Sequence, residues 1–143
     1  MRKSQYEALS EFRYQLRRFL HFSEEVAKKE ELTPLQYLLM LHVEGFPGRS
    51  WATVGEIAER LQMKHHGTVA LLTRCELLGL VERKKSTTDR RRVEVHLLEE
   101  GKLRLSRLAA LHEAELLSLK DVFSVHQITT FNDETLPAQD GLG

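Results

Sequence analysis

The stretch "LVERKKSTTDRRRVEVHL", from Leu80 to Leu97, decides the fold. Its end alternates apolar and polar residues from Val93 to Leu97, which is the period of a half-buried strand. Ser86 to Asp89 are turn-forming residue types, and "LVERKK" supplies an arm before them. We therefore predict a β-hairpin with a long and strongly charged tip.

Two helices are predicted directly before this hairpin. In "TVGEIAERL", Thr53 suits an N-cap and Glu56 stands three residues later, as a capping box requires, so a short helix should end near Gln62. After a brief break, "HHGTVALLTRCELLG" predicts a further helix with Gly79 at its C-terminal cap. Two helices joined by a short turn and followed by a hairpin form a winged helix-turn-helix.

The second of these helices has two different sides. At 100° per residue one side gathers Thr68, Leu71, Leu72 and Cys75, and the opposite side gathers His66, Ala70 and Thr73, flanked by Val69 and Arg74. The first side suits packing. The second is small or polar, and such a face fits the DNA major groove, about 12 Å wide, while an arginine-rich hairpin tip can reach the minor groove or phosphates.

Long helices are predicted on both sides of this region. Apolar residues recur at helical spacing from Ser4 to about Lys29, a buried helix runs from Pro34 to Val43 behind a Thr33 cap, and "FPGRSW" is predicted as loop. From about Glu99 to Phe123 there are two apolar stripes, one of Leu105, Leu108, His112, Leu116 and Leu119, the other of Leu103, Ala110, Leu111, Ala114 and Leu117. Two apolar faces on one helix need two packing partners, which favours a homodimer.

The charge is distributed unevenly along the chain. The 143 residues carry 21 basic and 21 acidic side chains, so the formal net charge is zero. Residues 60–92 nevertheless hold nine basic and three acidic residues, a net +6, whereas residues 93–143 hold four basic and nine acidic, a net −5. The local field is what a phosphate backbone meets, so the middle of the chain favours nucleic acid.

Composition limits the class of protein. A chain of this length with 41% apolar residues can bury one core, which predicts a single domain. One cysteine cannot form an internal disulfide, and there is neither a leader pattern nor an apolar run of about 18 residues, so we expect a soluble, cytoplasmic protein without a membrane partner. No nucleophile elbow, glycine-rich phosphate loop or zinc motif suggests an enzyme, and no cofactor is expected.

Four segments, "LTPLQY", "TVGEIAERL", "KHHGTVALLTRCELLGLVER" and "DRRRVEVHLLEEG", resemble the successive signature segments of the MarR family of bacterial transcriptional regulators. The similarity extends from about residue 19 to 119, and the last segment is the most specific. It implies a mainly α fold with a small β-hairpin wing, in which a winged helix-turn-helix (about 34–98) joins dimerisation helices (about 4–30 and 99–136) before a loose tail (137–143). It also implies a homodimer, most often a repressor, on a palindromic operator in double-stranded DNA, tuned by a small molecule that enters between the dimer joint and the winged region.

The resemblance also implies which residues bind DNA. Asp89 and Arg91 match the family's wing motif Asp-x-Arg, with Arg91 entering the minor groove and Asp89 orienting it or a neighbour. Whether Arg90 or Arg91 enters the groove stays open. The complete set of expected DNA-binding residues is Lys64, His65, His66, Ala70, Thr73, Arg74, Asp89, Arg90 and Arg91.

Three alternatives compete with this interpretation. His42 and His112, with acidic neighbours, could make a zinc-sensing regulator of the same fold, although no tight ligand spacing accompanies them. Cys75 could sense oxidants, although its place on the packed side predicts a core residue. A winged helix can also bind protein instead of DNA, which would require an exposed apolar face, and Leu77 and Leu78 only hint at one.

Overall fold

A computed structural model describes residues 1–118 of the chain. The described residues form α1 (Lys3–Lys29), α2 (Pro34–Glu44), β1 (Trp51–Thr53), α3 (Val54–Leu61), α4 (His65–Leu77), β2 (Val81–Lys85), β3 (Val93–Leu97) and α5 (Glu99–Ser118). This is the mainly helical winged helix-turn-helix fold that the sequence predicts. The part of the predicted dimerisation helices (99–136) beyond residue 118 and the predicted tail (137–143) lie outside the described residues.

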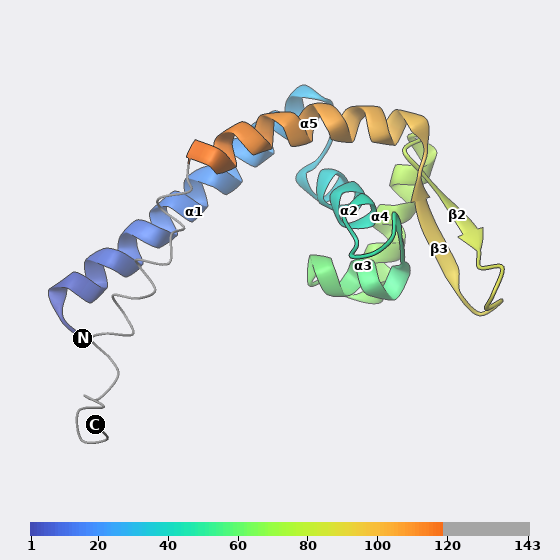
Figure 1. Cartoon of the computed structure of the whole chain (residues 1–143), viewed down its shortest axis with the longest axis horizontal. Coiled ribbons are helices and arrows are strands. Elements are labelled where there is room, and N and C mark those ends of the chain that lie inside the picture. Colours follow the sequence, from blue (N-terminus) through green and yellow to red (C-terminus); the bar gives the residue numbers. More distant parts are fainter. Residues whose placement is uncertain (119–143) are drawn as a thin grey trace, which may run out of the picture. The chain divides into compact units, whose positions relative to one another are not determined.

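The described chain divides into two compact units. Of the described residues, one unit contains Met1–Ser23 and 112–118, and the other is Glu24–Leu111, which holds α2, α3, α4 and all three strands. The second unit therefore contains every residue that we expected to bind DNA. Figure 1 shows its β2–β3 hairpin extending from the end of α4, with α3 and α4 as neighbouring helices.

The helix ends follow the predicted capping chemistry. Thr33 and Gln36 form a complete capping box at α2, and Thr53 and Glu56 form another at α3. After α4, Gly79 has a positive φ of 74°, its N–H bonds to the carbonyl of Glu76, and the N–H of Leu80 bonds to that of Cys75. This is the Schellman arrangement, which glycine favours because it has no Cβ to collide with the backbone. It turns the chain sharply from α4 into β2.

The sheet has one strand more than the sequence predicts. β3 is central, β2 pairs with it antiparallel on one side, and β1 pairs with it antiparallel on the other, with Trp51 opposite His96. The prediction that Trp51 belongs to a loop was therefore wrong. A three-residue strand shows no alternation of its own, and its pairing depends on a partner more than forty residues away in the sequence.

The core of the second unit lies where α2, α3, α4 and the sheet meet. Its fully buried side chains include Leu39, Met40, Val43, Ile57, Thr68, Leu72, Cys75, Leu80, Val81 and Val95. Thr68 is the polar member, and it is satisfied because its hydroxyl donates to the carbonyl oxygen of Lys64 at 3.0 Å. Burying this set fixes which side of α4 faces outward.

Candidate nucleic-acid interface

The two sides of α4 are separated as predicted. Thr68, Leu71, Leu72 and Cys75 are buried, and the six residues expected on or beside the outward face, Lys64, His65, His66, Ala70, Thr73 and Arg74, are all exposed. Lys64 is the N-cap residue and is exposed, and its ammonium group, which can only donate, makes no capping hydrogen bond. From Lys64 to Arg74, α4 therefore presents a side of small, polar and basic residues, and the exposed Leu77 follows at its C-terminal end.

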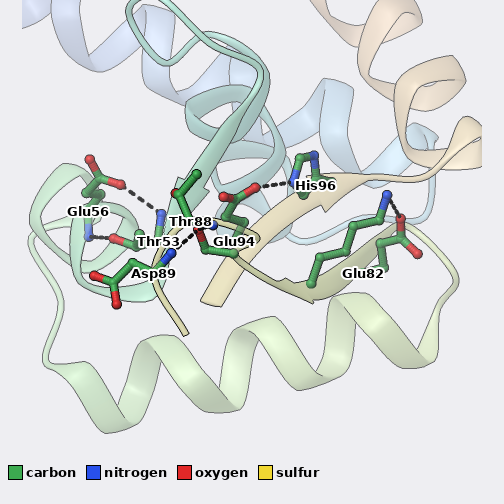
Figure 2. A network of polar contacts seen from close by, with 9 residues as sticks. Thr53, Glu56, Glu82, Thr88, Asp89, Glu94 and His96 are labelled. Carbon is green, nitrogen blue, oxygen red and sulfur yellow. Dashed lines mark hydrogen bonds and ion pairs between the residues drawn. The ribbon is translucent and has the colours of Figure 1, made fainter. Parts of the chain in front are cut away.

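The wing tip is built around Ser86, which the sequence identified only as a turn former. Its hydroxyl oxygen accepts hydrogen bonds from the backbone N–H groups of Thr88 (3.2 Å) and Asp89 (3.1 Å), and it lies 3.1 Å from the hydroxyl of Thr88. Its own N–H donates to the carbonyl of Arg92, which closes the loop. Figure 2 shows Thr88 and Asp89 in this turn. Ser86 is only 6% exposed, so the turn has a small polar core.

This turn places the arginines of the tip in solvent. Asp89 Oδ1 accepts a hydrogen bond from the backbone N–H of Arg91 at 3.0 Å, and lies 4.0 Å from Arg91 Nε. The Arg91 side chain is 98% exposed, and Arg90 and Arg92 are exposed too. Asp89 thus forms a hydrogen bond with the backbone of Arg91 but only a long contact with the Arg91 guanidinium. The guanidinium therefore stays available to a partner.

Arg92 lies just outside the strand ladder of the hairpin. The strand begins at Val93, and Glu82 contacts Lys84 at 3.1 Å and pairs in register with His96. The turn extends through Arg92, so Arg92 precedes the first paired residue of β3 and does not lie opposite Glu82. Its N–H bonds instead to the carbonyl of Asp89.

A residue that sequence reasoning did not single out connects the wing to α4. Arg83, on β2, contacts Glu76 through Nε at 2.6 Å, and its Nη2 donates to the Thr73 hydroxyl at 2.9 Å. Thr73 in turn donates to the carbonyl of Val69 at 3.0 Å. The sequence marks Arg83 only as one basic residue among nine, since nothing in its spacing reveals which carboxylate it meets.

The loop between α2 and β1 is held by stacked cationic and aromatic groups. The Arg49 guanidinium carbon lies 4.2 Å from the Phe46 ring centre and 3.8 Å from that of Trp51, and Arg49 also forms an ion pair with Glu56. Burial raises the pKa of the Glu56 carboxyl, but hydrogen bonds from Thr53 and the contact with Arg49 outweigh it, so the pKa is lowered. Figure 2 shows Thr53 and Glu56 in contact beside the Glu94–His96 pair. These contacts fix the start of α3 against the sheet.

The residues of the redox and zinc alternatives lie in other surroundings. Cys75 is completely buried, and burial, followed by the charge of Glu76, raises its pKa to about 11, which makes it a poor nucleophile. His112 lies 2.8 Å from the hydroxyl of Ser23 and edge-on to Phe19 and Phe22, whereas His42 belongs to the other unit. Within residues 1–118 no three His, Cys, Asp or Glu side chains gather as metal ligands.

Known proteins share this arrangement of helices and wing. The model of the MarR family matches residues 31–92, the segment from the start of α2 to the end of the wing tip. Residues 31–92 of this chain therefore match the MarR family of transcriptional regulators. The chain is thus similar to transcriptional regulators, and no enzyme is among the relatives described next.

Three similar proteins illustrate this match. An uncharacterized HTH-type regulator of Bacillus subtilis, YsmB, is 26% identical over 121 residues, covering 80% of this chain and 77% of the relative. AbsC, a MarR family regulator from Streptomyces coelicolor, has the same fold with a TM-score of 0.72 and 20% identity, covering 99% and 96% of the two chains. NadR, solved in complex with 4-hydroxyphenylacetate, aligns with a TM-score of 0.66 and 19% identity over 82% and 81%.

The chain thus has a winged-helix fold like that of MarR family transcriptional regulators, and its match to that family points to regulation through DNA binding. Among the described residues of this regulator, no helix is both long and apolar enough to span a membrane.

Proposed function

We propose that the protein is a repressor that binds a palindromic operator as a homodimer and responds to a small molecule. One observation carries the DNA-binding part: a single compact unit exposes both the outward side of α4 and the arginines of the wing tip. We assign α4 to the major groove, through Lys64, His65, His66, Ala70, Thr73 and Arg74. We assign the wing to the minor groove and its phosphates, through Asp89, Arg90 and Arg91.

Exposed apolar residues on the long helices support the homodimer. On α5, Leu105, Leu108 and His112 are buried, whereas the other stripe, Leu103, Ala110, Leu111, Ala114 and Leu117, is exposed. α1 adds Tyr6, Leu9, Phe12, Leu16 and Leu20, each at least 36% exposed. A run of exposed apolar side chains along two helices marks an association surface. A two-fold dimer reads two half-sites about one helical turn apart, which requires a palindrome.

The proposed ligand response is supported by the match to the MarR family and by the similar protein NadR, which was solved in complex with 4-hydroxyphenylacetate. A ligand acts only if it binds one conformation of the dimer more tightly than another, and here it would favour a spacing of the two α4 helices that no longer matches the half-sites. We therefore expect an effector to lower operator affinity without unfolding the protein.

A second candidate is a winged helix that binds protein. Leu77 and Leu78, at the end of α4, are 82% and 49% exposed, which gives this candidate a specific apolar patch. The patch consists of two residues, however, and lies within the stretch 60–92, which has a net charge of +6. Phosphate is the better match to that charge.

The test is selection of bound fragments from the source organism's genome, followed by a band-shift titration on the selected site. We expect a palindromic site, with log K falling by roughly 0.9 per log unit of salt for each phosphate neutralised. Binding that ignores salt, or a selection that enriches no sequence, would contradict DNA binding. The genes beside the site will indicate which effectors to test.

A further inference from the structure

The contact between Arg83 and α4 lies on the side of the helix that we assign to DNA. Thr73 and Glu76 are three residues apart, so they lie on neighbouring turns of one face. Arg83 reaches both, with Nε at 2.6 Å from Glu76 Oε1 and Nη2 at 2.9 Å from Thr73 Oγ1. One guanidinium on β2 therefore contacts two residues of α4.

This contact differs in kind from the others that join the wing to α4. Leu80, Val81 and Cys75 bury apolar surface there, and such burial is not directional, so it allows a helix to rotate slightly about its axis. A planar guanidinium with two fixed donors does not allow this, because rotation of α4 would break one hydrogen bond or the other. Arg83 thus fixes the rotation of α4 about its own axis relative to β2.

The same contact determines what Thr73 can offer to a base. Its hydroxyl proton is used on the carbonyl of Val69, and one of its lone pairs accepts from Arg83. What remains is one acceptor lone pair and a methyl group, and neither can donate to a base edge. In the major groove these fit an amino group of cytosine or adenine, or the methyl group of thymine.

Glu76 supports the same interpretation through its charge. It is one of three acidic residues in a stretch with nine basic ones, and a carboxylate near the DNA-binding side weakens attraction to phosphate. Binding that depended on charge alone would improve without it.

From these observations we propose that Arg83 and Glu76 are positioning residues for operator specificity: they fix the orientation of α4 relative to the wing and the hydrogen-bonding state of Thr73. This inference rests on the DNA-binding function proposed above. It predicts that operator affinity and general DNA affinity respond differently when the contact is removed.

The test compares Glu76→Gln, Arg83→Gln and Arg83→Lys with two controls, one matched to the charge lost at Glu76 and one to the charge lost in Arg83→Gln. Binding is measured to the selected operator and to an unrelated duplex. Glu76→Gln removes a negative charge, so charge alone predicts tighter binding to both duplexes. We expect the opposite for the operator, a loss of roughly five- to tenfold, while affinity for the unrelated duplex is unchanged or higher. Arg83→Lys keeps the charge but loses the fork, and should lower the operator preference with an unchanged salt slope.

The controls are Glu82→Gln and Lys85→Gln on the same strand. Glu82 contacts Lys84 and not α4, so its loss should leave the operator preference unchanged. Lys85 is exposed, and its loss should weaken binding to both duplexes equally. Thermal melting of each variant separates a folding defect, which would lower both affinities by the same factor.

Three outcomes are distinguishable. If the wild type shows no sequence preference, the proposed function fails and this inference fails with it. If the wild type discriminates but Glu76→Gln binds the operator more tightly, the inference alone is wrong. If Arg83→Lys retains full preference while Arg83→Gln lowers the salt slope by about 0.9 for both duplexes, Arg83 contacts phosphate directly and does not position α4.

Discussion

Arg91 combines an ordered backbone with a free side chain. Its N–H is fixed by Asp89, while its guanidinium is 98% exposed and 4.0 Å from the nearest Asp89 oxygen. An exposed pair at this distance contributes little to stability. We therefore predict that Arg91→Ala lowers operator affinity by about 1–3 kcal/mol and leaves thermal stability nearly unchanged.

Arg90→Ala is the matched comparison, because it removes the same charge from the adjacent exposed position. Band-shift titrations of both variants show which arginine enters the groove, since the one that does should lose more affinity than its neighbour. Equal affinity of Arg91→Ala and wild type would remove Arg91 from the interface.

Gly101 is required by a close backbone approach. A Cβ built there would lie 2.2 Å from the carbonyl oxygen of Leu80, whereas one at Gly55 in α3 would meet nothing within 4 Å. We predict that Gly101→Ala lowers the free energy of unfolding by about 1–3 kcal/mol, because a buried backbone must shift. Gly55→Ala should instead raise it by about 0.5–1 kcal/mol through the helix preference of alanine. Denaturant titration measures both, and a neutral Gly101→Ala would show that α5 is free to move away.

At the scale of elements, the predictable features were those with a local cause. Helices α2 and α3 begin at the capping boxes of Thr33 and Thr53, and α4 ends just before Gly79, because caps and periodicity act over a few residues. The strand at Trp51 was missed because only pairing across the fold creates it.

In the candidate site, too, the features with a local cause were predictable and those that depend on contacts across the fold were not. The sequence predicts which side of α4 faces outward, since apolar spacing determines that. It does not reveal that Arg83 bonds to Thr73, or that Ser86 organises the wing tip, because both depend on side-chain conformations in the folded chain. Whether the exposed residues contact DNA stays a prediction.

The Glu56 carboxyl at the start of α3 should make the stability of the fold depend on pH. The Glu56 pKa is lowered in the fold from an ordinary value of 4.5, so its carboxylate stabilises the folded state above that value, and the contribution is lost as pH falls through the lowered pKa. We predict that Glu56→Gln is less stable than wild type at about pH 7, and that the difference shrinks once pH falls below 4.5 and disappears below the lowered pKa. Thermal melting across pH tests this, and a difference that persists in acid would mean that packing, not charge, is lost.

For the whole molecule, neutrality is an average over a middle segment of +6 and a C-terminal segment of −5. A basic reading surface in a neutral protein limits nonspecific attraction to nucleic acid while keeping a local attraction at the site. In the proposed dimer, two such surfaces would bind two half-sites together, and the second binding event would then benefit from a high effective concentration. Dimerisation and operator affinity should therefore be lost together.

Leu111 offers a direct test of that coupling. It lies in the exposed stripe of α5 and is itself 49% exposed, so a glutamate there should leave the folded monomer intact but place charges in the proposed dimer joint. We predict that Leu111→Glu sediments as a monomer at micromolar concentration, melts close to the wild-type temperature if the monomer is stable alone, and binds the full operator at least tenfold more weakly. Leu77→Glu is the control, because Leu77 is 82% exposed on α4, away from that stripe, and its variant should remain dimeric. A Leu111→Glu protein that still sediments as a dimer would place the joint on other residues, whereas a wild-type monomer would rule out the dimer itself.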